Sequence, residues 1–444
     1  MHSPKMSFTA AGDMLIQRMI PADHEGREQI RDHVCRGDAR FFNLETTLHK
    51  GGLYGNYFNG GSYLRADPGV LRTALDYGFN MLSFANNHTF DFGYGGLEST
   101  LRAVDEAGFV HAGVGMNLDD AAMPAYLESS KGRVALIAAA STMASPNNYA
   151  AMAGRQSRQV IGRPGVNGLR VAEKIEVTPS EFDIVRDVIE RSGINAYNNI
   201  LKKEGYATPD TEGSEVPFGD SSVVFFRGDR TKYHTYVNKE DMDRIERAIA
   251  EAKAQADYIL VSIHAHEIAG DSKETPAEFL TDFAHRCIDK GAHAVLGHGP
   301  HLLRPLEIYK DRPIFYSLGD FVLHNESMRY APEEMYAMQG LTSDDLISDV
   351  FRKRSSNYTR GLLCDRRMME SVIPYFEMED GKLTYMELLP ISLSPDLPRY
   401  RRGDPTVAKD SGILERLAEM SAVYGTAIKI NEQGIGVVEW KNDL

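Results

Sequence analysis

The chain has 444 residues, of which 42% are hydrophobic, and it carries a formal net charge of −14. This length and composition allow a large buried core, in one domain or in two or three. The acidity argues against nucleic-acid binding and against attachment to an anionic membrane, because both need a basic surface. The oligomeric state is left open.

No apolar stretch of the kind found in signal peptides follows Met1, and the longest purely apolar run, Val134–Ala140, is far shorter than the roughly 20 residues that span a bilayer. We therefore expect a cytoplasmic protein. Its three cysteines, Cys35, Cys287 and Cys364, are widely spaced, so neither a disulfide framework nor a cysteine zinc cluster is predicted.

Strand-like and helix-like segments alternate along most of the chain, which is typical of layered α/β folds. Before residue 140 we predict helices at Arg27–Val34, Pro68–Tyr77 and Gly96–Ala107 between apolar strands. The alternation resumes with helices at Glu240–Ala254 and Pro276–Lys290. Consecutive strands then follow at Leu306–Tyr309, Pro313–Leu318, Ser371–Glu377 and Lys382–Leu389, which predicts antiparallel pairing and hence mixed sheets.

Two stretches interrupt this alternation. Residues 143–239 are rich in turns and contain one helix-like segment, Ser180–Arg191, whereas residues 325–369 are helix-like and rich in Met and Arg. Long excursions between core elements often form lids or binding surfaces. We interpret both as insertions into a single catalytic domain, 1–444, and as candidate lids or substrate-binding segments.

Short apolar runs repeatedly end in clusters of carboxylate, amide or imidazole side chains. The runs are Ser7–Ala11 before Asp13, Ala39–Phe42 before Glu45, Met81–Ala85 before Asn86, Asn87, His88 and Asp91, Tyr258–Ile263 before His264 and His266, Ala294–Leu296 before His298 and His301, and Pro313–Leu318 before Asp320. Ligands gather where the carboxyl ends of buried strands open into loops. The pattern predicts one polar site built from distant segments.

This combination of side chains is the ligand set of divalent metals such as manganese, iron or zinc. A bridging carboxylate can hold two such ions about 3.5–4 Å apart, where they polarise an oxygen and supply hydroxide. The candidate ligands are Asp13, Glu45, Asn87, His264, His298 and His301. We expect Asp91 to orient His88, as carboxylates often do for imidazoles. For Asp320, a role in supporting a ligand and a role as a ligand explain the sequence equally well.

In order, Gly12-Asp13, Asn43-Leu44-Glu45, Ala85-Asn86-Asn87-His88 with Asp91, His264, Gly297-His298-Gly299-Pro300-His301 and Gly319-Asp320-Phe321 resemble the motifs of the CapA family. That family is named for capsule and poly-gamma-glutamate synthesis and belongs to the calcineurin-like metallophosphoesterases. The resemblance spans roughly residues 7–140 and 240–325. It implies a four-layer αββα sandwich of two mixed sheets, here with the two inserted helical or loop segments.

The resemblance also implies roles. Asp13 would be a terminal ligand, Glu45 the bridging carboxylate and Asn87 the amide ligand, with His264 and His301 completing the metal set. His88 would protonate a leaving group, and His298 or His266 would fill the remaining histidine place. The phosphoesterases have a histidine two residues after the first aspartate, where this chain has Leu15. One ion, two ions or none are therefore all compatible with the sequence.

Four arginines with intervening Gly and Pro lie in Arg155–Arg170. Guanidinium groups suit carboxylate or phosphate recognition, so Arg163 and Arg170, together with His266, are candidate substrate-binding residues. The leading hypothesis is a metal-dependent hydrolase of an anionic phosphoester or glutamyl-type peptide. No phosphate-binding Gly-x-x-x-x-Gly-Lys-Ser/Thr loop and no Gly-x-Ser-x-Gly elbow occurs, which argues against an ATP-driven ligase and a serine hydrolase.

Two alternatives remain. In the first, Asp13 and His298 act as an acid–base pair in a metal-independent peptide epimerase. Peptide epimerases of lasso-peptide pathways also resemble the CapA fold. The protein can also be a non-catalytic factor that binds an acidic polymer.

Overall fold

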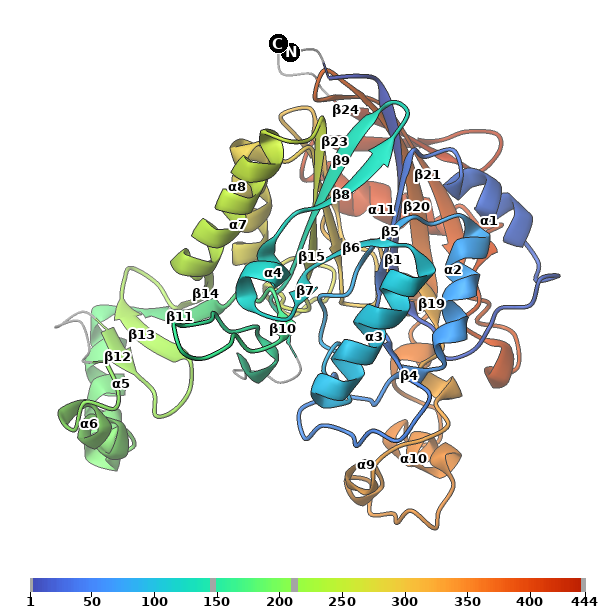
Figure 1. The fold of residues 1–444 in the computed structure, drawn as a ribbon. Coiled ribbons are helices and arrows are strands. Elements are labelled where there is room, and N and C mark those ends of the chain that lie inside the picture. The colour runs from blue at the N-terminus through green and yellow to red at the C-terminus, as the bar shows by residue number, and fades with distance from the viewer. Residues whose placement is uncertain (1–2, 144–148, 209–214, 441–444) are drawn as a thin grey trace.

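Two mixed β-sheets form the centre of the computed structural model, which describes residues 3–143, 149–208 and 215–440 (Figure 1). The larger sheet has ten strands in the order β23-β24-β21-β20-β1-β2-β5-β6, with β19 also pairing with β1 and β22 with β21. Its strands are β1 (Met6–Leu15), β2 (Ala39–Leu44), β5 (Met81–Ser83), β6 (Val110–Ala112), β19 (Asp320–Leu323), β20 (Glu370–Glu379), β21 (Lys382–Ser392), β22 (Thr406–Val407), β23 (Thr426–Ile430) and β24 (Gly436–Trp440).

The second sheet has six strands in the order β17-β18-β16-β15-β9-β8. They are β8 (Ala125–Ser129), β9 (Gly132–Ala140), β15 (Tyr258–His264), β16 (Ala294–His298), β17 (Leu306–Tyr309) and β18 (Arg312–Phe315). The predicted strand 313–318 ends at Phe315, and Leu318 instead forms an isolated antiparallel bridge with Leu303.

Alternate residues along β9 face opposite sides of the smaller sheet. Val134, Leu136 and Ala138 pack into the large core that it shares with the ten-stranded sheet. Ala135, Ile137 and Ala139 pack outwards against α7 (Lys239–Lys253) and α8 (Glu278–Lys290). Because strand side chains alternate between faces, a strand buried on both sides reads as a continuous apolar run.

Helices α1 (Arg27–Val34), α2 (Leu71–Tyr77) and α3 (Gly93–Ala107) cover the outer face of the larger sheet, opposite α7 and α8 (Figure 1). The predicted four-layer αββα arrangement of two mixed sheets is thereby confirmed. Smaller elements complete it: α4 (Leu118–Ala122), α11 (Gly412–Ala422), and the short strands β3 (Thr47–Leu48), β4 (Arg65–Ala66), β7 (Val114–Gly115) and β10 (Gly165–Val166).

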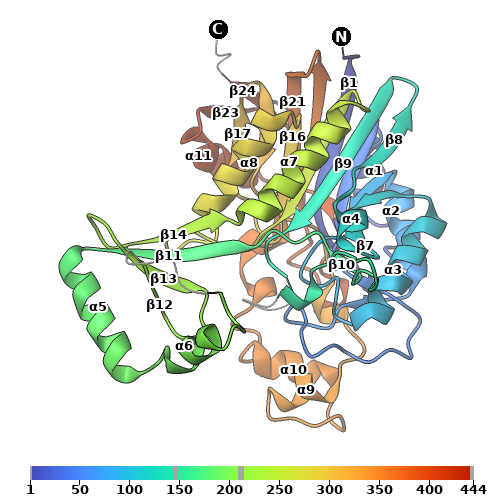
Figure 2. The same cartoon turned by 60° about the vertical axis from the view of Figure 1, so that its left-hand side comes forward.

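The first insertion, 143–239, differs from the helix and loop that we predicted. Besides α5 (Pro179–Ser192) and α6 (Ala196–Lys203), it forms a separate sheet in the order β12-β13-β11-β14. These strands, β11 (Val171–Val177), β12 (Glu215–Pro217), β13 (Val223–Arg227) and β14 (Lys232–Val237), extend away from the two main sheets (Figure 2). Most of their residues are partly exposed. Residues 144–148 and 209–214 lie outside the described residues.

The second insertion, 325–369, is helical as predicted and contains α9 (Glu333–Ala337) and α10 (Ile347–Arg354). A separate hydrophobic cluster attaches it to the rest of the protein, where Met335, Val350 and Phe351 pack with Tyr63 and Phe92. The lid function of both insertions stays a prediction. In the described part of the chain, no helix is both long and apolar enough to cross a membrane.

Candidate metal centre

Strand pairing brings the predicted polar side chains together at the carboxyl ends of the parallel strands. Asp13 on β1 is in register with Asn43 on β2 and with Asp320 on β19, and His264 on β15 is in register with His298 on β16. Gly12 is required at this junction, since a Cβ there would lie 1.7 Å from Gly319 O. That close approach lets the Asp13 amide donate to Gly319 O at 3.0 Å.

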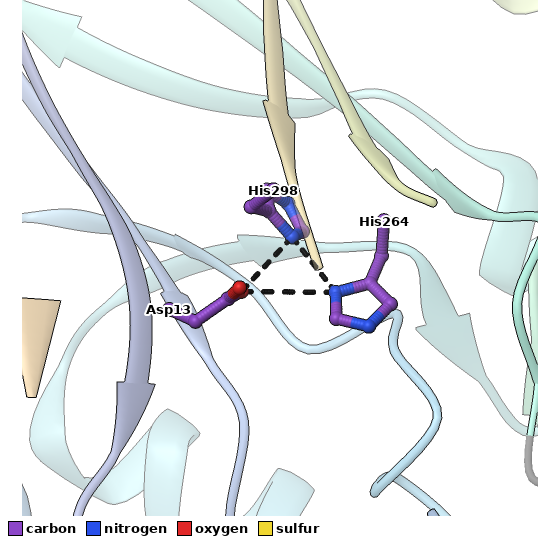
Figure 3. Close-up of side chains that lie close together, drawn as sticks. All are labelled: Asp13, His264 and His298. Atoms are coloured by element: carbon purple, nitrogen blue, oxygen red, sulfur yellow. Dashed lines mark hydrogen bonds and ion pairs between the residues drawn. The ribbon is translucent and has the colours of Figure 1, made fainter. Parts of the chain in front are cut away.

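Asp13, His264 and His298 form the first group of donor atoms, and all three side chains are fully buried (Figure 3). Asp13 Oδ1 lies 3.2 Å from His298 Nδ1 and 3.7 Å from His264 Nδ1, and the two Nδ1 atoms are 2.9 Å apart. The carboxylate is held by Asn43 Nδ2 at 2.7 Å and by the Gly299 amide at 2.7 Å.

The pKa directions in this group suit metal ligation. Burial by itself would raise the pKa of Asp13, but hydrogen bonds with His264 and His298 hold it well below its usual value. Burial lowers the pKa of His264 to about 4 and takes that of His266 well below its usual value. Near pH 7 the carboxyl is therefore ionised and these two imidazoles are neutral, which are the forms that bind metals.

Glu45 is the least satisfied group in the cluster. It is fully buried, and neither of its carboxylate oxygens has a hydrogen-bond partner in the described part of the chain. Burial, with the charges of Asp13, Asp320 and Asp91, raises its pKa well above the usual value. A buried carboxylate without donors is costly unless a cation compensates it.

Asp320 belongs to the same cluster. Its Oδ1 lies 3.0 Å from His301 Nδ1, its Oδ2 has no hydrogen-bond partner among the residues that the structure describes, and burial raises its pKa to about 6. His301 adopts a φ of 61°, an uncommon conformation for a residue other than glycine and one that often marks functional sites.

Three overlapping sets of side chains bring donor atoms within 4.8 Å of one another and can hold a metal ion. They are Asp13, His264 and His298; Glu45, His266 and His301; and Asp13, Glu45, His301 and Asp320. Asn87 adjoins them, with its Oδ1 2.8 Å from His264 Nε2. The orphaned carboxylate oxygens and the mixed N and O donors fit one or two divalent cations.

His88 lies beside this cluster. Its Nδ1 is 2.7 Å from Asp91 Oδ2, as predicted, and its Nε2 is 3.8 Å from Glu45 Oε1. Asp91 is fixed by the amides of Gly60 and Leu64 at 2.9 and 2.8 Å. Gly60 packs directly on the imidazole, where a Cβ would lie 2.6 Å from the ring. The ring is thus held in one orientation with Nε2 facing the centre.

The structure does not bring the two predicted arginines to this cluster. Arg163 donates from Nε and Nη2 to Met152 O, at 3.2 and 3.1 Å. Arg170 is engaged in ion pairs with Asp241, at 2.7 Å, and with Glu240, at 3.2 Å. Predicted substrate-binding residue His266 does join the cluster, with its Nε2 3.0 Å from His264 Nε2.

Sequence reasoning missed Arg304, which is only 1% exposed. Its guanidinium donates to backbone carbonyls of Ala265, His266, Glu267 and Lys273, and thereby shapes the loop that carries His266. Burial lowers its pKa to about 10. Its position three residues after His301 was the only available signal.

Residues 7–325 match the family described as "Bacterial capsule synthesis protein PGA_cap". Protein y4sH of Sinorhizobium fredii is 30% identical, over 97% of this chain and 92% of that protein. Capsule biosynthesis protein CapA of Bacillus anthracis is 24% identical, over 59% of this chain and 44% of that protein. A probable polyglutamine synthesis accessory protein of Mycobacterium tuberculosis is 26% identical, over 64% of this chain and 55% of that protein.

Proposed function

The chain belongs to the bacterial capsule synthesis (PGA_cap) family, and from this and its buried donor cluster we propose that it is a metal-dependent hydrolase of an anionic phosphoester or glutamyl-type peptide. The observation that carries the proposal is Glu45, whose two buried carboxylate oxygens have no hydrogen-bond partner among the described residues, although imidazoles and further carboxylates surround them. The names of the relatives, which refer to capsule and polyglutamine synthesis, support the glutamyl peptide.

Two sets of residues would hold the metal. Asp13, His264 and His298 form one, with Asn87 adjoining, and Glu45, His266, His301 and Asp320 surround the other. Glu45 is the candidate bridge. A divalent cation bound there would act as a Lewis acid and would lower the pKa of water.

The residues of the chain then divide the remaining work. Hydrolysis adds water across the scissile bond, so that OH joins the phosphorus or carbonyl carbon and the leaving oxygen or nitrogen takes a proton. His88 is placed to supply that proton from Nε2, because Asp91 occupies its Nδ1. General acids in such positions contribute typically 10²–10⁴-fold.

Metal analysis of protein purified without chelator tests the proposal, together with hydrolysis of p-nitrophenyl phosphate, bis(p-nitrophenyl) phosphate and a γ-glutamyl oligomer. We expect at least one manganese, iron or zinc ion per chain and cleavage of one of these substrates. Protein that lacks stoichiometric metal, and that gains neither metal nor activity on adding Mn²⁺, would overturn it.

A second candidate function is epimerisation of an amino acid within a peptide. It is favoured by the direct contact of Asp13 Oδ1 with His298 Nδ1, at 3.2 Å, because this buried pair can exchange one proton without a metal. Ser262 Oγ lies 2.8 Å from the other ring nitrogen of His298 and fixes the ring. Uptake of solvent deuterium at a peptide α-carbon by metal-free protein, without cleavage, would establish this function instead.

A further inference from the structure

A cavity of about 480 Å³ lies between the second insertion and the loop that carries Lys273. Its lining includes three cations, Lys273, Arg354 and Arg360, and two acids, Glu326 and Asp365. Both acids are already neutralised: Arg399 Nε donates to Glu326 at 2.8 Å, and Arg367 Nη2 donates to Asp365 at 2.6 Å.

The three cations are not neutralised in this way. Among residues 3–143, 149–208 and 215–440, no carboxylate lies within 4.0 Å of the charged groups of Lys273, Arg354 or Arg360. The excess of positive charge is unusual in a chain with a net charge of −14. Unpaired cations around a cavity attract an anionic ligand.

The cavity is linked through Lys273 to the loop that carries His266. Arg304, which shapes the His266 loop, also donates to Lys273 O at 2.8 Å. Lys273 is itself exposed and lines the cavity, so its ammonium group is accessible to a ligand.

A second connection runs through Arg354. Its Nη1 donates to Gly61 O and to Ser62 Oγ, both at 2.9 Å. The preceding residue, Gly60, packs on the His88 ring and donates its amide to Asp91. Arg354 is therefore anchored to the loop that orients the candidate general acid, and one of its two Nη groups and its Nε remain available for a ligand.

The backbone between the two arginines is strained. Ser356, Asn357 and Tyr358 adopt φ values of 50°, 57° and 63°, a left-handed conformation that is unfavourable for residues other than glycine. The turn brings the chain back after α10, so that Arg354 and Arg360 line the same cavity. Strain of this kind persists mainly at ligand-binding and catalytic sites.

We infer that this cavity binds the anionic part of the substrate next to the metal centre, with Lys273, Arg354 and Arg360 as its anion-binding residues, and that it accepts an extended chain bearing several separate carboxylates. The inference rests on the proposed function. The three cations come from separate segments, with Lys273 on its own loop and Arg354 and Arg360 on either side of the turn at residues 356–358. Three cations on separate segments suit carboxylates distributed along a peptide.

Binding of a fluorescein-labelled γ-glutamyl decamer to the full-length, chelator-treated protein tests this inference without requiring turnover. Arg360→Gln is the safest variant, because the side chain of Arg360 makes no hydrogen bond or ion pair in the described structure, and Lys273→Met and Arg354→Gln complete the series. We expect each variant to weaken binding about three- to tenfold and the triple variant about 30-fold or more. Arg354→Lys should restore part of the affinity.

Arg352→Gln is the matched control. It lies on the same helix, α10, pairs with Asp349 and does not line the cavity, so it should leave binding unchanged. Equal weakening by Arg352→Gln and Arg360→Gln, or equally tight binding of a γ-glutaminyl decamer, would overturn the inference. So would inorganic phosphate that displaces the decamer competitively and binds more tightly.

Failure of the inference and failure of the proposed function are distinguishable. If the wild type hydrolyses the decamer and the cavity variants bind it normally, the hydrolase stands and this assignment is wrong. If the variants lose binding and the protein neither holds metal nor cleaves, the cavity stands and the hydrolase is wrong.

Discussion

Glu45→Gln should change metal binding and the stability of the metal-free protein in opposite directions. Glu45 is buried without a hydrogen-bond partner, and its pKa is raised well above the ordinary value of 4.5. In metal-free protein at pH 7 the carboxyl must either stay ionised beside Asp13 and Asp320 or take up a proton. Proton uptake 2.5 pH units above the ordinary pKa costs about 3 kcal/mol, which is the upper limit of the destabilisation.

Glutamine avoids that cost, so the substitution should raise the free energy of unfolding of chelated protein by about 1–3 kcal/mol at pH 7. The sign follows from the raised pKa: the destabilisation is present above the unfolded-state pKa and disappears as the pH falls towards it. At pH 5 the difference from wild type should therefore shrink to below about 1 kcal/mol. Loss of the bridging charge should lower metal affinity by about 100-fold or more.

Urea unfolding of EDTA-treated protein at pH 7 and pH 5 measures the first effect, and elemental analysis after dialysis against Mn²⁺ measures the second. Glu267→Gln is the control, since Glu267 also has a raised pKa but accepts hydrogen bonds from Ser141 and Thr142. It should keep its metal. A Glu45→Gln protein with wild-type metal content and no gain in stability would refute the bridging role.

Three further outcomes are expected. His88→Ala should keep its metal but lower kcat by about 10²–10⁴, with the smallest loss for substrates with good leaving groups; equal loss of metal and activity would make His88 a ligand. Mn²⁺ at 100 times its Kd should stabilise chelated protein by about 2.7 kcal/mol through linkage, seen as a higher Tm, and an unchanged Tm would contradict a metal centre linked to folding. Burial, with the charge of Arg312, lowers the pKa of His293 to about 3 in the folded protein. As the pH falls below 6.5, the His293 imidazole therefore takes up a proton in the unfolded chain but not in the folded one, and the free energy of unfolding decreases. His293→Asn, whose Oδ1 can replace Nδ1 as acceptor for the Ile259 amide, should remove about 2–3 kcal/mol of the loss between pH 7 and pH 4.5 in urea unfolding, and an unchanged loss would refute the assignment.

The αββα layers were predictable because apolar runs mark strands buried on both faces, and because the polar residues after each run mark the strand ends. Helix α1 begins and ends at the predicted residues, Arg27 and Val34. The sheet in residues 143–239 was not predictable in this way, since its strands are partly exposed on both faces. Without a buried face, neither a continuous nor an alternating apolar pattern is required.

The residues of the candidate site were predictable only where they directly follow an apolar strand, because the end of the strand then fixes their position. Arg170 belongs to a basic, glycine-containing stretch, but its partner Asp241 is 71 residues later and only the folded chain reveals the pair. Arg354 belongs to the basic run Arg352, Lys353 and Arg354, but the sequence does not show that Arg352 pairs with Asp349 whereas Arg354 has no such acid among the described residues. Long-range charge pairing therefore explains why Arg170 does not reach the cluster.

Leu15 and Asp320 together suggest how a metal centre in this chain would dispense with the histidine that the phosphoesterases have two residues after the first aspartate. Leu15 packs in an apolar cluster with Leu64, Leu323 and Met369, so a polar ligand at that position would displace part of the core. The adjacent strand β19 instead places Asp320 in register with Asp13, and its free Oδ2 faces the same cluster. A carboxylate in place of an imidazole adds negative charge and oxygen character to the site, which favours manganese or iron over zinc. Metal analysis of the purified protein should therefore find one of these two metals, and Asp320→Asn should weaken its retention, whereas stoichiometric zinc unaffected by that substitution would contradict the compensation.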